Sequence, residues 1–210
     1  MKVLFATKNP SKVKYYAKEL EKYGFEILTI SDLDVEIDVE ETGKTGVENA
    51  ILKVLAYQTE TGMITIAIDD NLYFDEFDEE RQPGTNVRRV NGKRLSDMEM
   101  IEHYTNLVKE HGDKLSARWI KGVAIYDGKD MKTFSYKRES FYFVDKPYEK
   151  IHEGYPLDSI TVIPKYNKYL SELTDEELED YKNTSGNKEI FEFMVNTLKE
   201  IKENWIWELY

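Results

Sequence analysis

The sequence predicts an α/β protein in which a mixed β-sheet is flanked by helices. An apolar run at 3–6, a helical pattern from Pro10 and a second apolar run at 25–30 give a strand-helix-strand start. Later segments continue to alternate between strand-like and helix-like patterns. No internal repeat, low-complexity segment or linker divides the 210 residues, so we expect one domain over 1–210.

The first helix has clear start and stop residues. Asn9 is a favourable N-cap, and Pro10 follows it at the first helical position. The apolar spacing continues to Tyr23, and Gly24 then favours a helix end. We therefore expect a helix over 10–23 between the first two strands.

A second helix precedes the most apolar strand of the chain. Thr45 and Glu48 form a capping-box pattern, and Gly62 ends the apolar stripe that follows. Residues 64–68 are nearly all apolar, as expected of a central strand covered on both faces. We expect this strand to end where two aspartates follow it.

The second half repeats the alternation of helices and strands. Capping boxes, a Pro-Gly turn and an Asp-Gly hairpin turn mark its boundaries. In chain order we expect a loop over 75–92 with a turn at Pro83-Gly84, a helix from Ser96 to Gly112, strands over 115–126 and 131–143 around Asp127-Gly128, a strand over 161–163, a helix start at Thr174 and Glu177, and a last helix over 188–202.

Charge and composition exclude several classes of protein. The net charge is −12, from 29 basic and 41 acidic residues, which disfavours non-specific binding of nucleic acid. The absence of cysteine excludes disulfides, thiolate catalysis and zinc–thiolate sites. The start has too short an apolar run for a signal peptide, and the longest apolar run is far below the ~20 residues of a membrane span. We expect a soluble, cytoplasmic protein with no membrane partner.

The first candidate site is the turn between the first strand and the first helix. A helix N-terminus favours anions through its free N–H groups and its dipole. Thr7, Asn9 and Ser11 add short polar groups there, and Lys8 and Lys12 add positive charge. The alternative is an ordinary capped turn with surface lysines. The glycines of a P-loop are absent.

The second candidate lies around the start of the second helix. Glu40 and Glu41 are carboxylates of the kind that suit Mg²⁺, which prefers oxygen ligands. Asn49 and Lys53 are four residues apart and share a helix face that could line a cleft. The alternative is structural, because capping alone explains Glu48 and Lys53 could be a solvated surface lysine.

The third candidate is the pair Asp69-Asp70. Two carboxylates after a buried strand are costly unless they are paired or used. One could hold a metal ion while the other takes a proton from water. Alternatively they are turn residues before Asn71, since Asp and Asn favour turns.

Together these segments resemble the inosine triphosphate pyrophosphatase family. The resemblance is carried by Phe5–Lys12 (FATKNPSK), Glu40–Lys53 (EETGKTGVENAILK) and Ala67–Leu72 (AIDDNL). Further matches follow in the same order, at Pro83-Gly84 with Arg88-Arg89, at Ser116–Trp119 and at Gly154-Tyr155.

The resemblance implies a fold and an activity. The family has a single domain whose long mixed sheet forms two lobes around a central nucleotide cleft, and it is usually a homodimer. It cleaves nucleoside triphosphates between the α- and β-phosphates with Mg²⁺, giving a monophosphate and pyrophosphate. Its substrates are deaminated purine nucleotides such as ITP, dITP and XTP.

The resemblance also implies roles for individual residues. Asp70 would be the base that activates water, and Glu41 and Asp70 would bind the metal. Residues expected at the phosphates or elsewhere on the substrate are Thr7, Lys8, Asn9, Lys12, Lys53, Asn71, Tyr155, Asp158 and Lys182.

This chain departs from the family pattern mainly at the base end. Ser185-Gly186-Asn187 stands where the family has Ser-His-Arg, which reads the purine keto groups. We therefore expect a weaker preference for ITP over ATP and GTP. Two alternatives stay open, namely a nucleotide-binding protein with little turnover and a hydrolase for another modified nucleotide.

Overall fold

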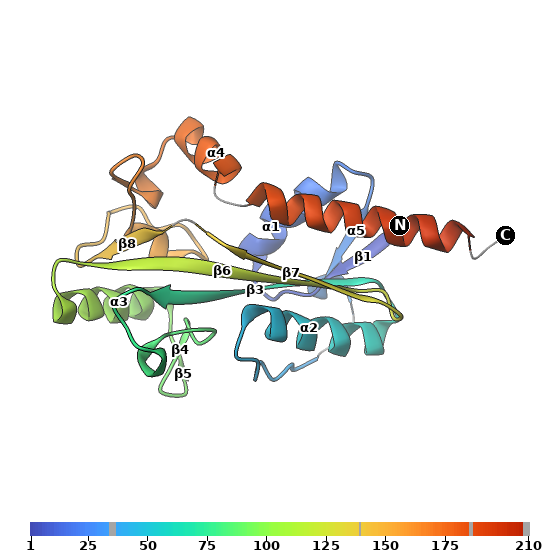
Figure 1. The fold of residues 1–210 in the computed structure, drawn as a ribbon, viewed down its shortest axis with the longest axis horizontal. Coiled ribbons are helices and arrows are strands. Elements are labelled where there is room, and N and C mark those ends of the chain that lie inside the picture. The colour runs from blue at the N-terminus through green and yellow to red at the C-terminus, as the bar shows by residue number, and fades with distance from the viewer. Residues whose placement is uncertain (34–36, 139, 185–186, 208–210) are drawn as a thin grey trace. The chain divides into compact units, whose positions relative to one another are not determined.

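The structure confirms the predicted α/β class with a mixed sheet flanked by helices (Figure 1). It is a computed structural model that describes residues 1–33, 37–138, 140–184 and 187–207. Its strands are β1 (Lys2–Phe5), β2 (Glu26–Thr29), β3 (Thr65–Phe74), β4 (Arg89–Val90), β5 (Lys93–Arg94), β6 (Lys114–Tyr126), β7 (Met131–Lys137), β8 (Phe141–Val144), β9 (Thr161–Ile163) and β10 (Lys168–Tyr169). Its helices are α1 (Pro10–Glu21), α2 (Gly46–Thr61), α3 (Asp97–His111), α4 (Asp175–Thr184) and α5 (Asn187–Trp207).

The main sheet has eight strands in the order β10-β9-β8-β6-β3-β1-β2, and β7 also pairs with β6. β1 pairs in parallel with β2 and β3, whereas β8 is antiparallel to β6 and β9. None of the described helices is both long and apolar enough to cross a lipid bilayer.

The chain divides into two compact units. The first comprises 1–70, 121–136 and 186–210, and the second comprises 71–120 and 137–185. β3 and β6 each begin in one unit and end in the other. That the whole chain acts as one domain stays a prediction.

The first unit has a helical layer on each face of its strands (Figure 1). Alternate residues of a strand point to opposite faces. Val3 and Phe5 of β1 pack into the core beneath α1 and α5, whereas Leu4 and Ala6 pack into the core beneath α2. This double burial explains why the first strands are almost continuously apolar.

The same alternation directs the two aspartates of β3. Ile66 and Ile68 face α1 and α5, and Ala67 faces α2. Asp69 therefore follows on the α2 face and Asp70 on the α1 face. The expectation that the strand ends at these aspartates is wrong. β3 continues to Phe74, because Leu72 and Phe74 are also buried, with exposures of 0% and 1%.

The helix starts follow the sequence closely, whereas α5 continues past the expected end at 202 to Trp207. Asn9 caps α1 by accepting hydrogen bonds from the backbone N–H groups of Ser11 and Lys12. The capping boxes at Ser96 and at Thr174 form as predicted. The box at Thr45 forms only by half, since the carboxylate of Glu48 accepts from the N–H of Lys44 instead of Thr45.

The second unit has its own core, and one strand assignment is wrong where the chain passes from the first unit into the second. The expected strand over 131–143 is two strands, β7 and β8. β8 pairs with Lys114–Ala117 of β6, and the N–H of Arg138 just after β7 donates to the carbonyl of Trp119. Successive segments of the chain therefore pair with different parts of one long strand, which a local pattern does not reveal. Phe141 and Phe143 anchor β8 in the core.

One glycine sets how closely α2 approaches the sheet. A Cβ atom at Gly122 of β6 would lie 2.1 Å from the backbone N of Val47 and 2.3 Å from the carbonyl carbon of Gly46. These contacts are with backbone atoms, which cannot rotate away. The N-terminus of α2 can therefore rest against β6 only because residue 122 has no side chain.

We expect Gly122→Ala to destabilise the protein by about 1–3 kcal/mol or more, because the added methyl group overpacks a closed interface. Urea unfolding followed by fluorescence measures this loss. Thr133→Ala, at an exposed position of β7, is the control and should change stability by less than about 0.5 kcal/mol. Equal stability of Gly122→Ala and the wild type would contradict the close approach of α2.

Candidate active site

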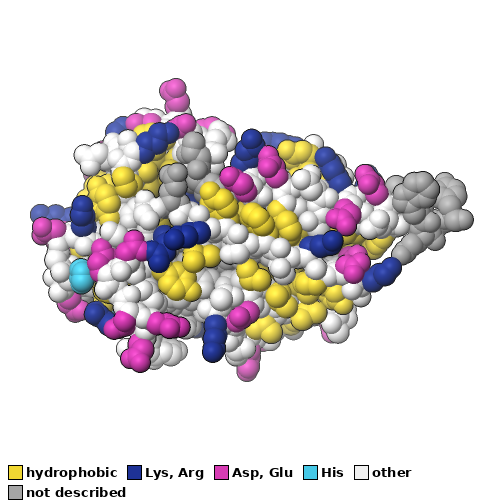
Figure 2. Space-filling model, in the orientation of Figure 1, with side chains coloured by type: hydrophobic (Ala, Val, Ile, Leu, Met, Phe, Trp, Pro, Cys, Tyr) yellow, Lys and Arg dark blue, Asp and Glu magenta, His cyan; other side chains and the backbone are white. Residues whose placement is uncertain are grey.

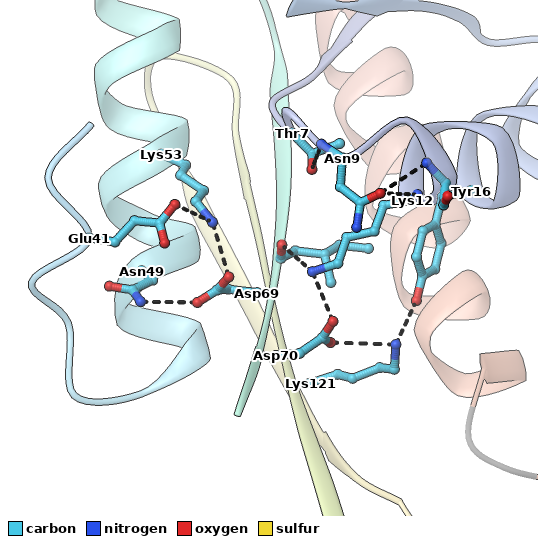
Figure 3. Close-up of polar contacts among 12 residues, drawn as sticks. Thr7, Asn9, Lys12, Tyr16, Glu41, Asn49, Lys53, Asp69, Asp70 and Lys121 are labelled. Atoms are coloured by element: carbon cyan, nitrogen blue, oxygen red, sulfur yellow. Dashed lines mark hydrogen bonds and ion pairs between the residues drawn. The ribbon is translucent and has the colours of Figure 1, made fainter. Parts of the chain in front are cut away.

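A buried carboxylate on β3 lies between two lysines from different elements (Figure 3). Asp70 Oδ2 is 2.8 Å from Nζ of Lys12 on α1, and Asp70 Oδ1 is 3.4 Å from Nζ of Lys121 on β6. Both lysine side chains are 13% exposed and that of Asp70 is 19% exposed. Lys12 Nζ also donates to the carbonyl oxygen of Ile68, at 3.5 Å. We call Lys12, Asp70 and Lys121 the cationic group.

Tyr16 supports this group from α1. Its hydroxyl oxygen accepts a hydrogen bond of 3.3 Å from Lys121 Nζ. The Tyr16 side chain is buried, and its ring packs against Phe5 and Phe191 with centroid distances of 5.9 and 5.2 Å. The ammonium of Lys121 is thus held against a rigid aromatic side chain.

The charges of this group shift each other's titration. Burial opposes ionisation of Asp70, but the ammonium groups of Lys12 and Lys121 outweigh it and hold the pKa of Asp70 well below its usual range. Burial would likewise lower the pKa of Lys12, but the carboxylates of Asp70 and Asp69 outweigh it and raise that pKa. Both groups therefore stay ionised throughout the physiological pH range.

A second ion-paired group lies on the α2 face. Lys53 Nζ is 3.0 Å from Asp69 Oδ1 and 3.1 Å from Glu41 Oε1. Asn49 Nδ2 donates to Asp69 Oδ2 at 3.0 Å, and Asn49 Oδ1 accepts from the N–H of Gly43 at 2.8 Å. These contacts join the segment after Glu41 to α2 and to β3. We call Glu41, Lys53 and Asp69 the anionic group.

The two aspartates are therefore not equivalent. Both carboxylate oxygens of Asp69 are engaged, one by Lys53 and the other by Asn49. Asp70 Oδ1 is buried and accepts no hydrogen bond among the described residues, and its contact with Lys121 is an ion pair of 3.4 Å. Asp69 thus holds Lys53 and Asn49 through both of its oxygens, whereas Asp70 keeps one buried oxygen that accepts no hydrogen bond among the described residues.

The turn before α1 offers side chains to the site, because its backbone N–H groups already have partners. The N–H groups of Ser11 and Lys12 donate to Asn9 Oδ1, and the N–H of Asn9 donates to Thr7 Oγ1 at 3.2 Å. The amides that a helix N-terminus offers to an anion are thus satisfied locally. Lys8 is exposed at the turn.

The acidic residues fit a magnesium ion. Among the described residues, no group of three acidic, histidine or cysteine side chains could form a metal cage. Mg²⁺ does not require one, because it commonly takes one or two protein carboxylates together with waters and phosphate oxygens. The buried Oδ1 of Asp70, without a hydrogen bond, is an oxygen suited to such a ligand. Glu41, the other predicted ligand, belongs to the anionic group through Lys53.

The sequence patterns did not indicate that Lys121 and Tyr16 belong to the site. In the sequence, Tyr16 fits the apolar stripe of α1 and carries no other signal. Lys121 lies in a segment that the sequence identifies only as a strand. A lysine within that long strand was the available clue. It has no local motif, because its partner Asp70 is about fifty positions earlier in the chain.

Comparison with known proteins decides the family. The model of the Ham1 family matches residues 3–184. The chain belongs to the Ham1 family. The predicted relationship to the nucleoside triphosphate pyrophosphatases is confirmed, because relatives of this chain are named dITP/XTP pyrophosphatase, which denotes a hydrolase of phosphoanhydride bonds.

Three Ham1-family relatives illustrate the similarity. The dITP/XTP pyrophosphatase of Bacillus subtilis is 30% identical over 176 residues, which is 83% of this chain and 86% of the relative. The Ham1 protein of Staphylococcus aureus has a TM-score of 0.74 at 26% identity, covering 95% of this chain and 99% of its own. The HAM1 protein of Coxiella burnetii, at 22% identity and TM-score 0.77 with 95% and 99% coverage, supports the fold alone.

The remaining predicted residues belong to the second unit. Asn71 is 1% exposed, and its Nδ2 donates to the hydroxyl of Tyr73. Asp158 pairs with His152 at 3.1 Å, and Tyr155 is 36% exposed just before it. Lys182 is half-buried on α4. Their roles toward a substrate stay predictions, and Ser185 and Gly186 lie outside the described residues.

The cationic group predicts how stability depends on pH. Asp70→Asn removes the carboxylate from two buried lysines, so we expect it to lower the free energy of unfolding by about 3 kcal/mol at pH 7. The pKa of Asp70 is lower in the folded chain than in the unfolded chain. Its contribution is therefore present above the unfolded pKa of about 4 and is lost as pH falls toward the folded pKa.

The difference between wild type and Asp70→Asn should accordingly shrink from about pH 5 to about pH 3. Urea unfolding at a series of pH values measures it. Asp130→Asn, at an exposed position, is the control and should stay parallel to the wild type. A constant difference for Asp70→Asn over this range would show that its ion pairs do not stabilise the fold.

Proposed function

We propose that this Ham1-family protein is a Mg²⁺-dependent nucleoside triphosphate pyrophosphatase that releases a monophosphate and pyrophosphate. The observation that carries the proposal is a buried carboxylate, Asp70, that is flanked by lysines and keeps one oxygen without a hydrogen bond. Deaminated purine nucleotides such as dITP, ITP and XTP are the proposed substrates, because dITP and XTP stand in the names of the relatives.

The site supplies the charge that the whole protein lacks. The net charge of −12 repels a triphosphate at long range. On the face drawn in Figure 2, lysine and arginine side chains are interspersed among aspartate and glutamate. In the site, by contrast, two largely buried ammonium groups share one carboxylate. Within a low-dielectric environment such charges act strongly on a nearby phosphate.

The proposed chemistry assigns a task to each residue. Lys12 and Lys53 bind phosphate oxygens, with Thr7, Lys8 and Asn9 at the turn as further contacts. Phosphates compete with Asp70 for the ammonium of Lys12. As that ammonium moves to the substrate, Asp70 becomes a stronger acceptor for the proton of the attacking water.

Glu41 and Asp70 are the residues proposed to hold Mg²⁺. When bound, the ion neutralises phosphate charge and polarises a phosphoryl oxygen. Asp69 keeps Lys53 and Asn49 in place through both of its oxygens. Asn71, Tyr155, Asp158 and Lys182 are proposed to contact the nucleoside. A homodimer and a cytoplasmic location are also part of the proposal, by resemblance to the family.

A product assay tests the proposal directly. Purified protein is incubated with ITP, dITP, XTP, GTP and ATP, with Mg²⁺ or with a chelator, and pyrophosphate and orthophosphate are quantified separately. We expect equimolar pyrophosphate and monophosphate, and no turnover with the chelator. Binding without turnover would favour the nucleotide-binding alternative, and orthophosphate as first product would exclude the proposed cleavage position. The ratio of kcat/KM values gives the base preference.

A matched pair of variants separates the two aspartates. Asp70→Asn keeps the size of the side chain but cannot accept the proton, so kcat should fall by about 10²–10⁴-fold. Asp69→Asn disturbs the orientation of Lys53 and Asn49, so KM should rise more than kcat falls. Steady-state kinetics with the best substrate measures both. A near-normal kcat in Asp70→Asn, or a larger kcat loss in Asp69→Asn, would reverse the assignment.

A further inference from the structure

Asn49 is a buried polar side chain that links two segments outside its own helix. Only 1% of the residue is exposed. Its Oδ1 accepts a hydrogen bond of 2.8 Å from the backbone N–H of Gly43, and its Nδ2 donates to Asp69 Oδ2 at 3.0 Å. Gly43 precedes α2, whereas Asp69 lies on β3. Both ends of the amide are therefore used, and each end holds a different part of the chain against α2.

These two hydrogen bonds belong to a closed ring of contacts. Asp69 uses its other oxygen for Lys53, at 3.0 Å, and Lys53 Nζ lies 3.1 Å from Glu41 Oε1 (Figure 3). From Glu41 the backbone leads through residue 42 back to Gly43. We call this closed set of contacts the Asn49 ring. It attaches segment 41–43 at both ends, through a side chain at residue 41 and through a backbone N–H at residue 43.

The space around residue 43 accepts only a glycine. A Cβ atom at Gly43 would lie 2.6 Å from Asn49 Oδ1. It would also lie 2.7 Å from the backbone N of Asn49 and 2.7 Å from Cβ of Glu48. These last two atoms are fixed by α2 and cannot rotate away. The close approach is a second observation, separate from the hydrogen bonds, that the Gly43–Asn49 contact constrains the sequence.

The chemistry of the ring requires an asparagine at residue 49. The Gly43 N–H donates and the carboxylate of Asp69 accepts, so the side chain between them must accept at one end and donate at the other. An aspartate would be an acceptor only and would place a second carboxylate against Asp69. An alanine would remove both hydrogen bonds. The amide therefore couples the segment before α2 to β3 in a way that these other side chains cannot.

We propose that Asn49 is a positioning residue that holds Glu41 where it would bind Mg²⁺. Two residues separate Gly43 from Glu41, so fixing Gly43 confines the Cα atom of Glu41 to within about 7 Å of it. Asn49 itself contacts neither metal nor substrate. The inference rests on the proposed function for the identity of the ion, whereas the ring is a feature of the protein alone.

The role of Asn49 follows from what substrate binding does to the ring. Lys53 is proposed to bind phosphate oxygens, and its contact with Glu41 competes with that task. When Lys53 turns to a phosphate, Glu41 loses this ion pair just as it is to hold the metal ion. The Gly43–Asn49 hydrogen bond uses no group assigned to the substrate, so it keeps the segment in place. Such outer contacts orient the ligands of a metal ion and raise its affinity.

The test measures metal binding without turnover. Protein is loaded with an α,β-methylene analogue of ITP, and free Mn²⁺ is measured by electron paramagnetic resonance. Loss of an outer partner of a metal ligand typically weakens metal binding by about 10–100-fold. We expect Asn49→Ala to raise the Kd of Mn²⁺ by about 10-fold, at the low end of that range, because Asn49 acts through the backbone. Asn49→Asp should raise it further. The Kd of the metal-free analogue should change far less.

Gly43→Ala and a double-mutant cycle test whether Asn49 acts through Glu41. Gly43→Ala should weaken Mn²⁺ binding as Asn49→Ala does, because it prevents the same contact from the other side. Glu41→Gln alone should weaken Mn²⁺ binding, and adding Asn49→Ala to it should cause no further loss. Asn106→Ala is the matched control. It removes an exposed asparagine from α3, so it should bind Mn²⁺ like the wild type.

The outcomes separate this inference from the proposed function. Normal Mn²⁺ binding by Asn49→Ala and Gly43→Ala would overturn the inference, and so would a loss that adds fully to that of Glu41→Gln. If Asn49→Ala does not fold, Asn49→Ser and Gly43→Ala decide in the same way. Normal Mn²⁺ binding by Glu41→Gln would also overturn it, while release of pyrophosphate by the wild type would still support the proposed function. The expected losses in a protein that releases no pyrophosphate would refute the proposed function and support the role of Asn49.

Discussion

The rest of the site depends on the ion pairs of Asp70. Its buried carboxylate lies between an ammonium group from α1 and one from β6. It requires Lys12 to lie within the first turn of α1, which the Asn9 cap fixes. It also requires Asp70 and Lys121 to lie on strands of one sheet. Strand alternation then sends Asp69 to the opposite face, where it orients Lys53. Moving β3 by one residue would put one aspartate in the position of the other and a non-acidic neighbour, Ile68 or Asn71, in the remaining position, so one of the two lysine groups would lose its carboxylate.

The same constraint explains how charge is distributed over the site. The cationic group has one excess positive charge, and the anionic group has one excess negative charge. A triphosphate with a divalent cation presents both signs as well. Each group therefore contains a lysine proposed for phosphate oxygens and a carboxylate proposed for Mg²⁺, and the charges of the two groups together cancel. The charges of the site also make phosphate binding depend less on the overall charge of the protein, because buried charges are screened less than surface charges.

Local patterns were sufficient for most elements and for part of the site. Caps at Asn9, Ser96 and Thr174 act over three residues, so they are visible in the sequence. The end of β3 is not visible in the sequence, because the continuation of this strand depends on burial of Leu72 and Phe74 by distant segments. Lys121 was missed for the same reason, since its meaning depends on Asp70 across the sheet. The resemblance to the inosine triphosphate pyrophosphatase family implied phosphate-binding roles for Lys12 and Lys53, but it implied no role for Lys121.

The residues proposed for phosphate chemistry and those proposed for the nucleoside belong to different parts of the chain. Thr7, Lys12, Glu41, Lys53 and Asp70 all lie in the first compact unit, and Tyr155, Asp158 and Lys182 lie in the second. Each unit has its own hydrophobic core, so side chains can change in one without repacking the other. The phosphates are common to all nucleoside triphosphates, whereas the base is what distinguishes them. A chain that retains the Phe5–Lys12, Glu40–Lys53 and Ala67–Leu72 motifs can therefore keep the hydrolytic chemistry while the proposed nucleoside contacts of its second unit, and with them its base preference, change.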